Sequence, residues 1–480
     1  MARAALLLVL VLGMCSCVRG RRGRSLAAAP APKELHIVHI NDVHNRIEQT
    51  STSSTTCSDA QAASGLCLGG WGRISSYVNA ARKKAAAAKA AFLFLDAGDQ
   101  FDGTLWDVVY KGAATAKMQN IVKPDVMVRF GAFNTGSLKN LHTHGLDSAG
   151  LAGSEFTFPP DILKAYIGNI TFPMLGACNT DTSDEPLLKG LIQKWKVWQF
   201  GPYKVAAVGW LTPDASFTAA NIGKVKVTPV NAAVKQCIAD LKKAHPDVHL
   251  IIGMSHTGYH PDIETAKQVP DLDIIISGHS HTFLRTPSKV GPIFDKTVNA
   301  TDETCLKKRA CDEPGGPYPT YVSSQKCSGV GAAKTCTNKT IPVVQVYYAS
   351  KYIGDVTLDL ATKKVTAAKP VLLGGDNSTS PWPQDPVILA EIEKLSGPVT
   401  ALEKKPAGKT SVVMIGGRPG RVAETNFGSY LADIMKNGPV TIALINSGSI
   451  RANIEPELVN YGDVLTALPF RNLLAVKLSR

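Results

Sequence analysis

The sequence predicts an α/β protein built around a largely buried sheet, and three observations lead to that prediction. Short apolar runs typical of buried strands alternate with helix-like stretches through the first 280 residues. The chain of 480 residues is too long for one ordinary domain. Hydrophobic residues make up 44% of it and charged residues 19%, which excludes a largely disordered chain. We therefore expect a layered α/β domain followed by a second domain.

The elements of the first domain are expected in a repeating strand and helix order. Residues 35–41 (LHIVHIN) alternate in polarity, whereas residues 91–96 (AFLFLD) form a continuous apolar run typical of a buried strand. Further strands are expected at 172–178, 204–210, 248–254, 272–277 and within 342–367. Helices are expected at 71–90, 111–122, 231–244 and 261–268.

A stretch of turn-forming residues separates the two expected domains. Residues 371–387 (VLLGGDNSTSPWPQDPV) are rich in Gly, Pro, Ser and Asp, which predicts a linker. A helix expected over 387–404 leads from it to a second domain that begins near Ala407. The expected organisation is a leader at 1–29, a first domain at 34–370, a linker with a helix at 371–406 and a second domain at 407–480.

The leader is predicted to be a secretory signal peptide. Arg3 supplies a short basic region, Ala4–Met14 an apolar one, and Ala27–Ala29 could hold the cleavage site. An uncleaved anchor is the alternative, but the apolar run is shorter than the ~20 residues that span a bilayer. No other window is apolar enough to cross a membrane. We expect a secreted or extracellular protein.

The charge balance indicates a mild preference for anions. The formal net charge is +13, and five arginines of the leader account for part of it. The remaining +8, spread over the rest of the chain, attracts anionic substrates weakly. It is not the footprint of a nucleic-acid-binding protein, because no basic stripe with interleaved aromatic residues accompanies it.

The cysteines fit an oxidising compartment. Two of the ten lie in the leader, and the eight beyond it form an even number. Cys57 and Cys67 flank a polar loop that a disulfide could close. Four more lie in the loop-rich stretch 286–341, where their pairing stays open and no histidine favours a zinc site: Cys305, Cys311, Cys327 and Cys336. Four sequons could be glycosylated in a eukaryotic secretory pathway: Asn169, Asn299, Asn338 and Asn377.

Residues able to bind metal follow four of the expected strands. They are Asp42 and His44, Asp99, His256, and finally His279 and His281. Strand ends are where α/β sheets place ligand groups, and mixed carboxylate and imidazole ligands suit zinc, manganese or iron. A single histidine after a strand is more often structural, but the joint pattern is hard to obtain by chance. Two ions about 3.5–4 Å apart can clamp a phosphate and activate a water, and Asp99 is a candidate for the shared ligand.

The segments that carry these residues resemble a known family. IVHINDVHNR, FLFLDAGDQFDGTLW, IIGMSHTGY and IIISGHSHTFL are similar to the signature blocks of calcineurin-like metallophosphoesterases, above all the secreted or periplasmic 5′-nucleotidases. RPGRVAETNFGSYLAD, INSGSIR and YGDVLTALPF resemble segments of the 5′-nucleotidase C-terminal domain. The resemblance implies a four-layer metallophosphoesterase β-sandwich flanked by helices, plus a partial α/β C-terminal substrate-binding domain.

The resemblance also implies two divalent metal ions, with zinc expected and manganese, cobalt or iron as alternatives. Asp42 and His44 match ligands of one ion, and His281 matches the position that completes that site. Asp99 matches the bridging aspartate. Ligands of the second ion are matched by His256 and His279.

Four residues of the second domain match substrate-binding positions, which implies a nucleotide as the partner. Arg421 and Arg451 match arginines on the phosphate side, where a forked guanidinium suits phosphate oxygens. Asn446 matches a substrate-binding asparagine. Phe470 matches one of two rings that stack on the base, although from the residues alone it would be a core side chain.

One departure from the family affects catalysis. The family carries a Gly-Asn-His-Glu-Phe-Asp block that should follow Pro124–Met127. It aligns either with Gly131–Asn134 or, preferably, with Gly153–Thr157, and in neither case are the Asn, the His and the Asp in place. No residue is therefore assigned as catalytic. His142 and His144 could substitute for the missing histidine, but histidines in solvated loops are the more common case. Residues 128–152 as a whole resemble a retained intron.

The expected function is that of a 5′-nucleotidase-like phosphohydrolase that releases phosphate from nucleoside monophosphates. The loss of the Asn-His block predicts impaired activity, and the chain stops partway through the expected second domain, which resembles a truncation. One alternative is a non-catalytic secreted protein that binds metal or nucleotide. Other enzyme alternatives are a nucleotide diphosphohydrolase, a UDP-sugar hydrolase and a cyclic-nucleotide phosphodiesterase. The sequence indicates no oligomeric state.

Overall fold

The structure, a computed structural model, describes residues 31–51, 54, 56–101, 103–128, 160–213, 222–286, 314–328, 335–374, 382–421, 423–436 and 442–468. The chain divides into two units, Met1–Ala31 and Pro32–Arg480, and the description below concerns the second. The predicted signal peptide at 1–29 lies outside the described residues. Among the helices of the described part, none is both long enough and apolar enough to cross a membrane.

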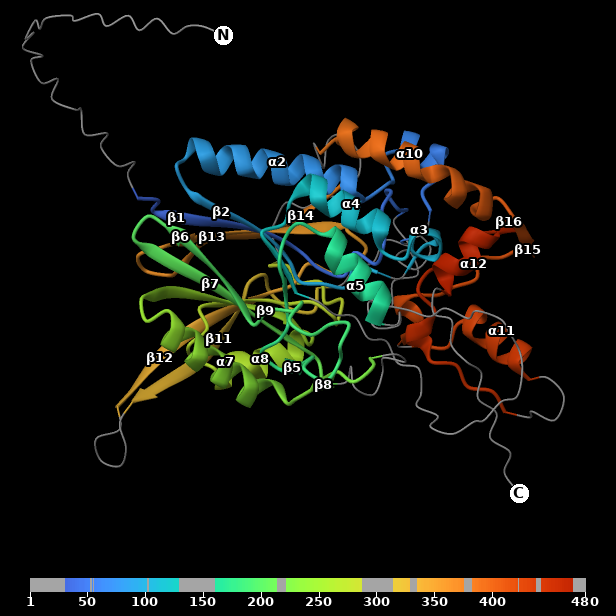
Figure 1. Cartoon of the computed structure of the whole chain (residues 1–480). Coiled ribbons are helices and arrows are strands. Elements are labelled where there is room, and N and C mark those ends of the chain that lie inside the picture. Colours follow the sequence, from blue (N-terminus) through green and yellow to red (C-terminus); the bar gives the residue numbers. More distant parts are fainter. Residues whose placement is uncertain are drawn as a thin grey trace, which may run out of the picture. The chain divides into compact units, whose positions relative to one another are not determined.

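Two six-stranded sheets form the centre of this unit (Figure 1). In the first, the strand order is β14-β13-β1-β2-β3-β4; in the second, it is β11-β12-β10-β9-β7-β6. The first sheet consists of β1 (Glu34–Ile40), β2 (Ala91–Asp96), β3 (Val126–Val128), β4 (Met174–Leu175), β13 (Tyr352–Asp359) and β14 (Val365–Leu372). The second consists of β6 (Trp195–Phe200), β7 (Tyr203–Leu211), β9 (Val248–His256), β10 (Ile274–Ile276), β11 (Thr320–Ser328) and β12 (Thr335–Val344).

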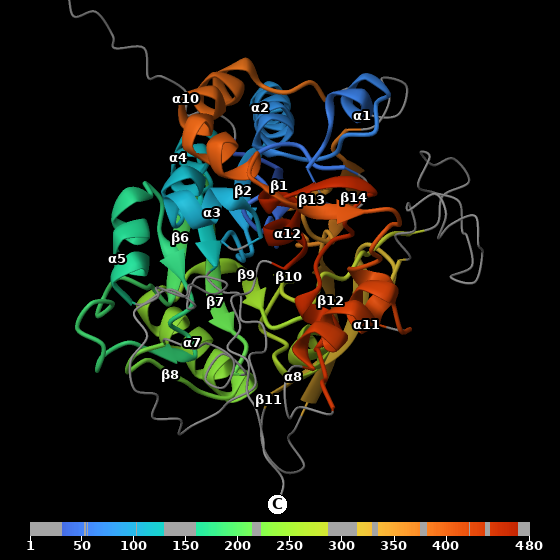
Figure 2. The ribbon, with the colours of Figure 1, turned by 90° about the vertical axis from the view of Figure 1, so that its right-hand side faces the viewer.

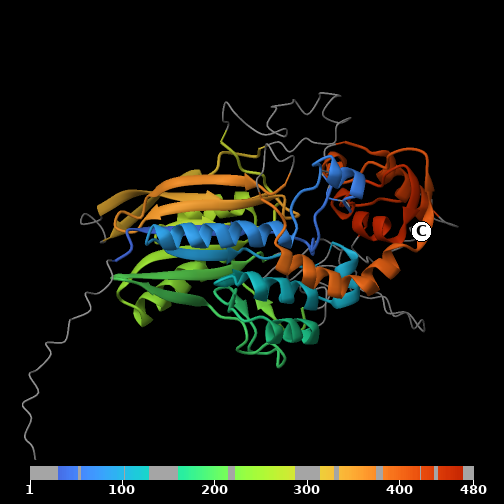
Figure 3. The same ribbon diagram turned by 90° about the horizontal axis from the view of Figure 1, so that it is seen from above.

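Helices cover the outer faces of both sheets, which gives the four layers that the resemblance implies (Figures 1 and 3). On the first sheet lie α2 (Trp71–Ala87), α3 (Leu105–Tyr110), α4 (Ala113–Val122), α5 (Pro160–Asn169) and α10 (Pro386–Glu403). On the second lie α7 (Val230–Ala244) and α8 (Tyr259–Gln268). In Figure 2, α10 runs beside α2 and α4, with which it is in contact. Asp385 caps α10 because its side chain accepts a hydrogen bond from the Val387 amide.

Smaller elements complete the described part. The short helix α1 (Asp59–Ala63) follows Cys57. Two two-stranded sheets pair β5 (Thr180–Asp181) with β8 (Lys226–Val227), and β15 (Pro406–Thr410) with β16 (Glu457–Asn460). The predicted second domain also contains α11 (Asn426–Met435), α12 (Tyr461–Ala467) and the single turns η2 (Arg418–Arg421) and η3 (Ser447–Ser449).

The core explains why β1 carries apolar side chains on both faces. Leu35 and Ile37 belong to a cluster that also contains residues of the second sheet, such as Val205 of β7. Val38 and Ile40 belong to a second cluster beneath α2 and α10. The second sheet therefore covers one face of β1 and helices cover the other, so both faces are apolar, although β1 pairs parallel with β2 and antiparallel with β13.

Most of the predicted elements are confirmed, with small differences at their ends. The strand expected at 172–178 is reduced to β4, and the helix expected at 111–122 begins at Ala113. The prediction for 286–341 is wrong in its second half, because β11 and the start of β12 form a long hairpin there. The predicted Cys57–Cys67 disulfide is present, and Cys327 pairs with Cys336 across this hairpin. Cys178 pairs with Cys237, while Cys305 and Cys311 lie outside the described residues.

The topology brings four strand ends together. Strands β1 and β2 run parallel in the first sheet, and β9 and β10 run parallel in the second. Their carboxyl ends lead directly into the four segments that carry the predicted metal ligands. Ligand groups in α/β sheets collect at such carboxyl ends, so the fold itself places the candidate site.

Candidate metal centre

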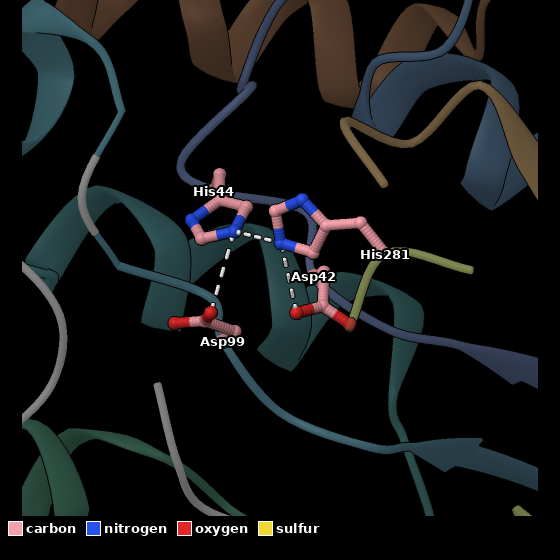
Figure 4. Close-up of side chains that lie close together, drawn as sticks. All are labelled: Asp42, His44, Asp99 and His281. Carbon is pink, nitrogen blue, oxygen red and sulfur yellow. Dashed lines mark hydrogen bonds and ion pairs between the residues drawn. The ribbon is translucent and has the colours of Figure 1, made fainter. Parts of the chain in front are cut away.

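Four side chains that lie far apart in the sequence converge at these strand ends (Figure 4). Asp42 and His44 follow β1, Asp99 follows β2 and His281 follows β10. All four are buried, and one ligand atom from each lies within 4.8 Å of the others. Two carboxylates and two imidazoles withdrawn from water are a donor set that suits a divalent transition-metal ion.

The distances between these groups are those of a shared cation site. The Nε2 atom of His44 lies 2.8 Å from the Nε2 atom of His281 and 3.3 Å from an Asp99 oxygen. The Nε2 atom of His281 lies 3.2 Å from an Asp42 oxygen. Two imidazole nitrogens that face each other can share one proton, or both can donate their lone pairs to a metal ion.

The contacts of the His256 ring indicate whether the pocket fits a second ion. Its Nδ1 lies 2.6 Å from the carbonyl oxygen of Ala97, to which it can donate a hydrogen bond, and this leaves the lone pair on Nε2. The buried Nε2 has no hydrogen-bond partner among the described residues, and it lies 3.9 Å from Asp42 and 3.8 Å from Asp99. These distances are too long for hydrogen bonds. They fit atoms that point at a common ion, and His279 is close by, with its ring centroid 5.2 Å from that of His256.

Burial alone makes this pocket unfavourable for negative charge. Burial raises the pKa of Asp42 to about 8, and Asp99 adds to the increase, while His256 and hydrogen bonds from Asn41 and His279 oppose it. A divalent cation would reverse this trend, because it stabilises the ionised carboxylates. A bound cation would therefore stabilise this group of buried side chains.

The backbone at the site is held in an unusual conformation. The φ angles are 49° at Asp42, 51° at His44, 60° at Asp99, 77° at His279 and 50° at His281, all in the left-handed region. Such residues cost of order 1–3 kcal/mol each and collect at functional sites. Backbone hydrogen bonds hold them: the amide of Asp42 donates to Gly98 over 2.8 Å, and that of His44 donates to Asp99 over 3.0 Å.

Three polar residues that the sequence analysis did not single out support the ligand loops. The Asp96 carboxylate accepts hydrogen bonds of 2.9 Å from the Gly98 amide and from the side chain of Gln100. Asn41 donates to Asp42 over 2.7 Å. The side-chain amide of Gln345 donates to the Gly278 carbonyl over 2.9 Å. Asn41 and Asp96 stand beside the predicted ligands in the sequence, but no local pattern marks Gln345.

Comparison with known proteins decides the family. The sequence profile of the calcineurin-like phosphoesterases matches residues 35–283, just over half of the chain. The protein is a calcineurin-like phosphoesterase. The profile of the 5′-nucleotidase C-terminal domain matches residues 406–478. The resemblance seen in the sequence is therefore confirmed.

Similar proteins span both regions. The phosphoesterase is 29% identical over 472 residues to a 5′-nucleotidase of Bos taurus, covering 93% of this chain and 70% of that one. The same identity holds over 472 residues of a 5′-nucleotidase of Homo sapiens, again covering 93% and 70%. The crystal structure of a 5′-nucleotidase precursor from Thermus thermophilus matches with a TM-score of 0.70 and 25% identity, covering 91% of this chain and 74% of that one.

The family uses a dinuclear site of divalent metal ions, and the phosphoesterase has a group of residues that could hold metal where such a site is expected. The buried carboxylates and the unsatisfied Nε2 atom of His256 fit such ions. The Asn-His-Asp block has no counterpart among the described residues, because 129–159, including His142 and His144, lie outside them.

The predicted substrate residues are only partly brought to this centre. Arg451, which is 8% exposed, places a guanidinium nitrogen 3.4 Å from the Nε2 atom of His44. Asn446 is exposed, and its side chain accepts a hydrogen bond of 3.0 Å from the Gly448 amide at the start of η3. Arg421 ends η2, but its side chain lies outside the described part, as does Phe470.

Proposed function

We propose that this phosphoesterase hydrolyses nucleoside 5′-monophosphates to nucleosides and phosphate. The observation that carries the proposal is the buried group of Asp42, His44, Asp99 and His281. The relatives that carry the name 5′-nucleotidase, and the match to a 5′-nucleotidase C-terminal domain, support a nucleotide as the substrate.

In the proposed centre, Asp42, His44 and His281 would hold one ion, His256 and His279 would hold the second, and both ions would share Asp99. We propose zinc, because it accepts both carboxylate and imidazole ligands in low coordination number. The ions would neutralise charge on the phosphate and lower the pKa of a water for attack on phosphorus. The Ala97 carbonyl fixes the tautomer of His256, so that Nε2 rather than Nδ1 faces the centre.

We assign the nucleotide to the residues of the second domain. The guanidinium of Arg451 is close enough to the centre to bind an oxygen of the phosphate. Arg421, Asn446 and Phe470 are proposed to hold the rest of the nucleotide. This assignment goes with the proposed division into a signal peptide at 1–29, a phosphoesterase domain at 34–370, a linker at 371–406 and a substrate domain at 407–480.

Phosphate release from AMP tests the proposal. The purified full chain, supplied with Zn²⁺ or Mn²⁺, should release phosphate, and chelation should stop the release. Asp99→Asn should lower kcat/KM by at least ~10², because both ions lose a shared charge. Asp247→Asn is the matched control, because Asp247 is exposed and forms its ion pair with Lys204 at the amino ends of β7 and β9, whereas the candidate site lies at the carboxyl ends; this variant should keep full activity.

The alternatives are outcomes of the same assay. Binding of metal and AMP without phosphate release would favour the non-catalytic protein and overturn the proposal. Release from ADP, UDP-glucose or cyclic AMP but not from AMP would change the substrate class. The missing Asn-His-Asp block predicts a rate ~10²–10³ below that of a complete site, so the assay needs long incubations.

Secretion is the proposed location. It is supported by the three disulfides of the described part, which favour an oxidising compartment, and by similar proteins that include one named snake venom 5′-nucleotidase. Of the predicted sequons, Asn169 and Asn338 are exposed, which suits glycosylation. Asn299 and Asn377 lie outside the described residues.

A further inference from the structure

We infer that Tyr348 is a positioning residue that holds the imidazole of His281 in the plane required for metal binding. The two rings lie face to face, with centroids 4.8 Å apart and an angle of 7° between their planes. This inference rests on the metal centre of the proposed function. It assigns a task to a residue outside the ligand set, on a segment that is 67 positions away in the sequence.

His281 can bind a metal ion only if its ring plane has a defined orientation. The torsion between Cβ and the imidazole ring is broad, so covalent geometry does not fix where Nε2 points. A metal ion binds only along the lone pair, which lies in the ring plane. A flat ring stacked on one face therefore limits rotation and keeps Nε2 directed at Asp42 and His44. His256 is held differently, through the hydrogen bond from its own Nδ1.

Tyr348 is itself held in place from several sides. Its ring and that of Tyr347 pack edge to face, with centroids 4.6 Å apart and planes at 79°. The ammonium of the buried Lys351 lies 5.6 Å from the centre of the ring. The hydroxyl of Ser54 donates a hydrogen bond of 3.3 Å to the Tyr348 oxygen. A ring with this many contacts can restrain the ring that it faces.

The turn that carries Tyr348 is attached to the ligand loops. Tyr347, Ala349 and Ser350 have φ angles of 63°, 55° and 57°, so the turn is a strained one. The amide of Ala349 donates to the carbonyl of Asp42 over 2.8 Å. The side chain of Asn41 donates to the Tyr347 carbonyl over 2.7 Å. These two hydrogen bonds stabilise the strained turn. They connect it to the loop that supplies Asp42 and His44, so the position of Tyr348 is fixed relative to the metal centre.

Metal titration of Tyr348 variants tests the inference. The full chain, stripped with a chelator, is titrated with Co²⁺, whose visible absorption reports each ion that binds. Tyr348→Met keeps a long apolar side chain but loses the flat face, and it should weaken one of the two sites by about 10–100-fold. Tyr348→Phe keeps the face and should bind both ions as the wild type does. Tyr321→Met, at an exposed tyrosine on β11, is the matched control and should change nothing.

The outcomes separate this inference from the proposed function. A wild-type chain that binds no pair of ions contradicts the metal centre itself. A wild-type chain that binds two ions, with Tyr348→Met equal to it at both sites, overturns the role of Tyr348. The melting temperature of each metal-free variant is measured in parallel, and Tyr348→Leu replaces Tyr348→Met if the latter is unfolded. Recovery of phosphate release by excess metal in Tyr348→Met would support positioning rather than a direct part in the reaction.

Discussion

Single residues at the strand ends adopt conformations that an isolated chain would avoid. His256 lies within a regular strand, but the other five predicted ligands have left-handed backbone angles. At roughly 1–3 kcal/mol each, this strain is tolerated because the turns are hydrogen-bonded to one another. The site is therefore built from tight turns, and the residues next to the ligands have little space for larger side chains.

Gly278 is the residue where that lack of room is most easily tested. A Cβ atom added there would lie 2.7 Å from His256 Nδ1 and 2.9 Å from the Ala97 oxygen, which are the two atoms of the hydrogen bond that orients His256. Gly278→Ala should lower the free energy of unfolding by about 1–3 kcal/mol and weaken metal binding. Urea unfolding and Co²⁺ titration measure the two effects.

The control is Gly397→Ala, because a Cβ at Gly397, inside α10, meets nothing within 4 Å. It should raise the free energy of unfolding by up to ~1 kcal/mol, since alanine is the better helix former. Equal stability and metal affinity in Gly278→Ala and the wild type would contradict the packing described for the centre.

A second residue-scale prediction concerns pH. Burial lowers the pKa of His39 to about 3, although Asp355 acts in the opposite direction. The unfolded state, with a pKa near 6.5, then binds more protons than the folded state between pH 6.5 and about 3. The free energy of unfolding should therefore fall as the pH is lowered through this window, by at most ~1.4 kcal/mol per pH unit from this group.

Urea unfolding of the metal-free protein at pH 6.5 and pH 5 measures this slope. His39→Gln should reduce it, whereas His260→Gln, at an exposed histidine, should leave it unchanged. Identical slopes for wild type and His39→Gln would show that the buried ring does not account for the pH dependence.

Much of the candidate site could be anticipated at the residue scale, because ligand residues follow strands in a local pattern. The structure brings Asp42, His44, Asp99 and His281 together, while their role as ligands stays a prediction. The supporting residues could not be anticipated. Gln345 and Tyr348 act on loops that lie more than 60 residues away, and only the fold brings them there.

At the element scale, periodicity predicted the long strands and helices and failed on short or exposed ones. The runs at 91–96 and 248–254 are mostly apolar, and they are strands whose residues are buried on both faces. The hairpin β11–β12 was not predicted, because its outer half is polar and exposed and such a pattern is typical of a loop. Its stability comes from cross-strand pairing and from the Cys327–Cys336 disulfide rather than from a buried pattern.

The other disulfides allow a quantitative comparison of elements. Cys178–Cys237 links residues 59 apart and ties the segment after β4 to α7, whereas Cys57–Cys67 links residues only 10 apart. Loop entropy predicts that the first contributes ~4 kcal/mol and the second ~3 kcal/mol. Cys178→Ala/Cys237→Ala should therefore lower the urea midpoint more than Cys57→Ala/Cys67→Ala does. The reverse order would contradict the entropic explanation.

On the scale of the whole molecule, Arg451 links the predicted substrate domain to the metal centre. Arg451→Ala should lower kcat/KM for AMP by ~10²–10³, because a charged donor to the phosphate is lost, and it should leave both ions bound. Arg451→Lys should not restore the rate fully, since lysine lacks the forked geometry.

Steady-state kinetics and Co²⁺ titration distinguish these effects. Arg82→Ala is the matched control, because the Arg82 guanidinium lies over the Phe92 ring in the first domain and should not affect kcat/KM. Full activity of Arg451→Ala would contradict the proposal that Arg451 binds the phosphate of AMP.

The central claim is that the strand-end residues hold a pair of ions. Anomalous scattering from crystals of the full chain grown with Zn²⁺ tests it most directly. Two peaks about 3.5–4 Å apart are expected, with Asp99 between them, one near His44 and His281 and the other near His256 and His279. Crystals whose zinc peaks all lie away from these residues would contradict it.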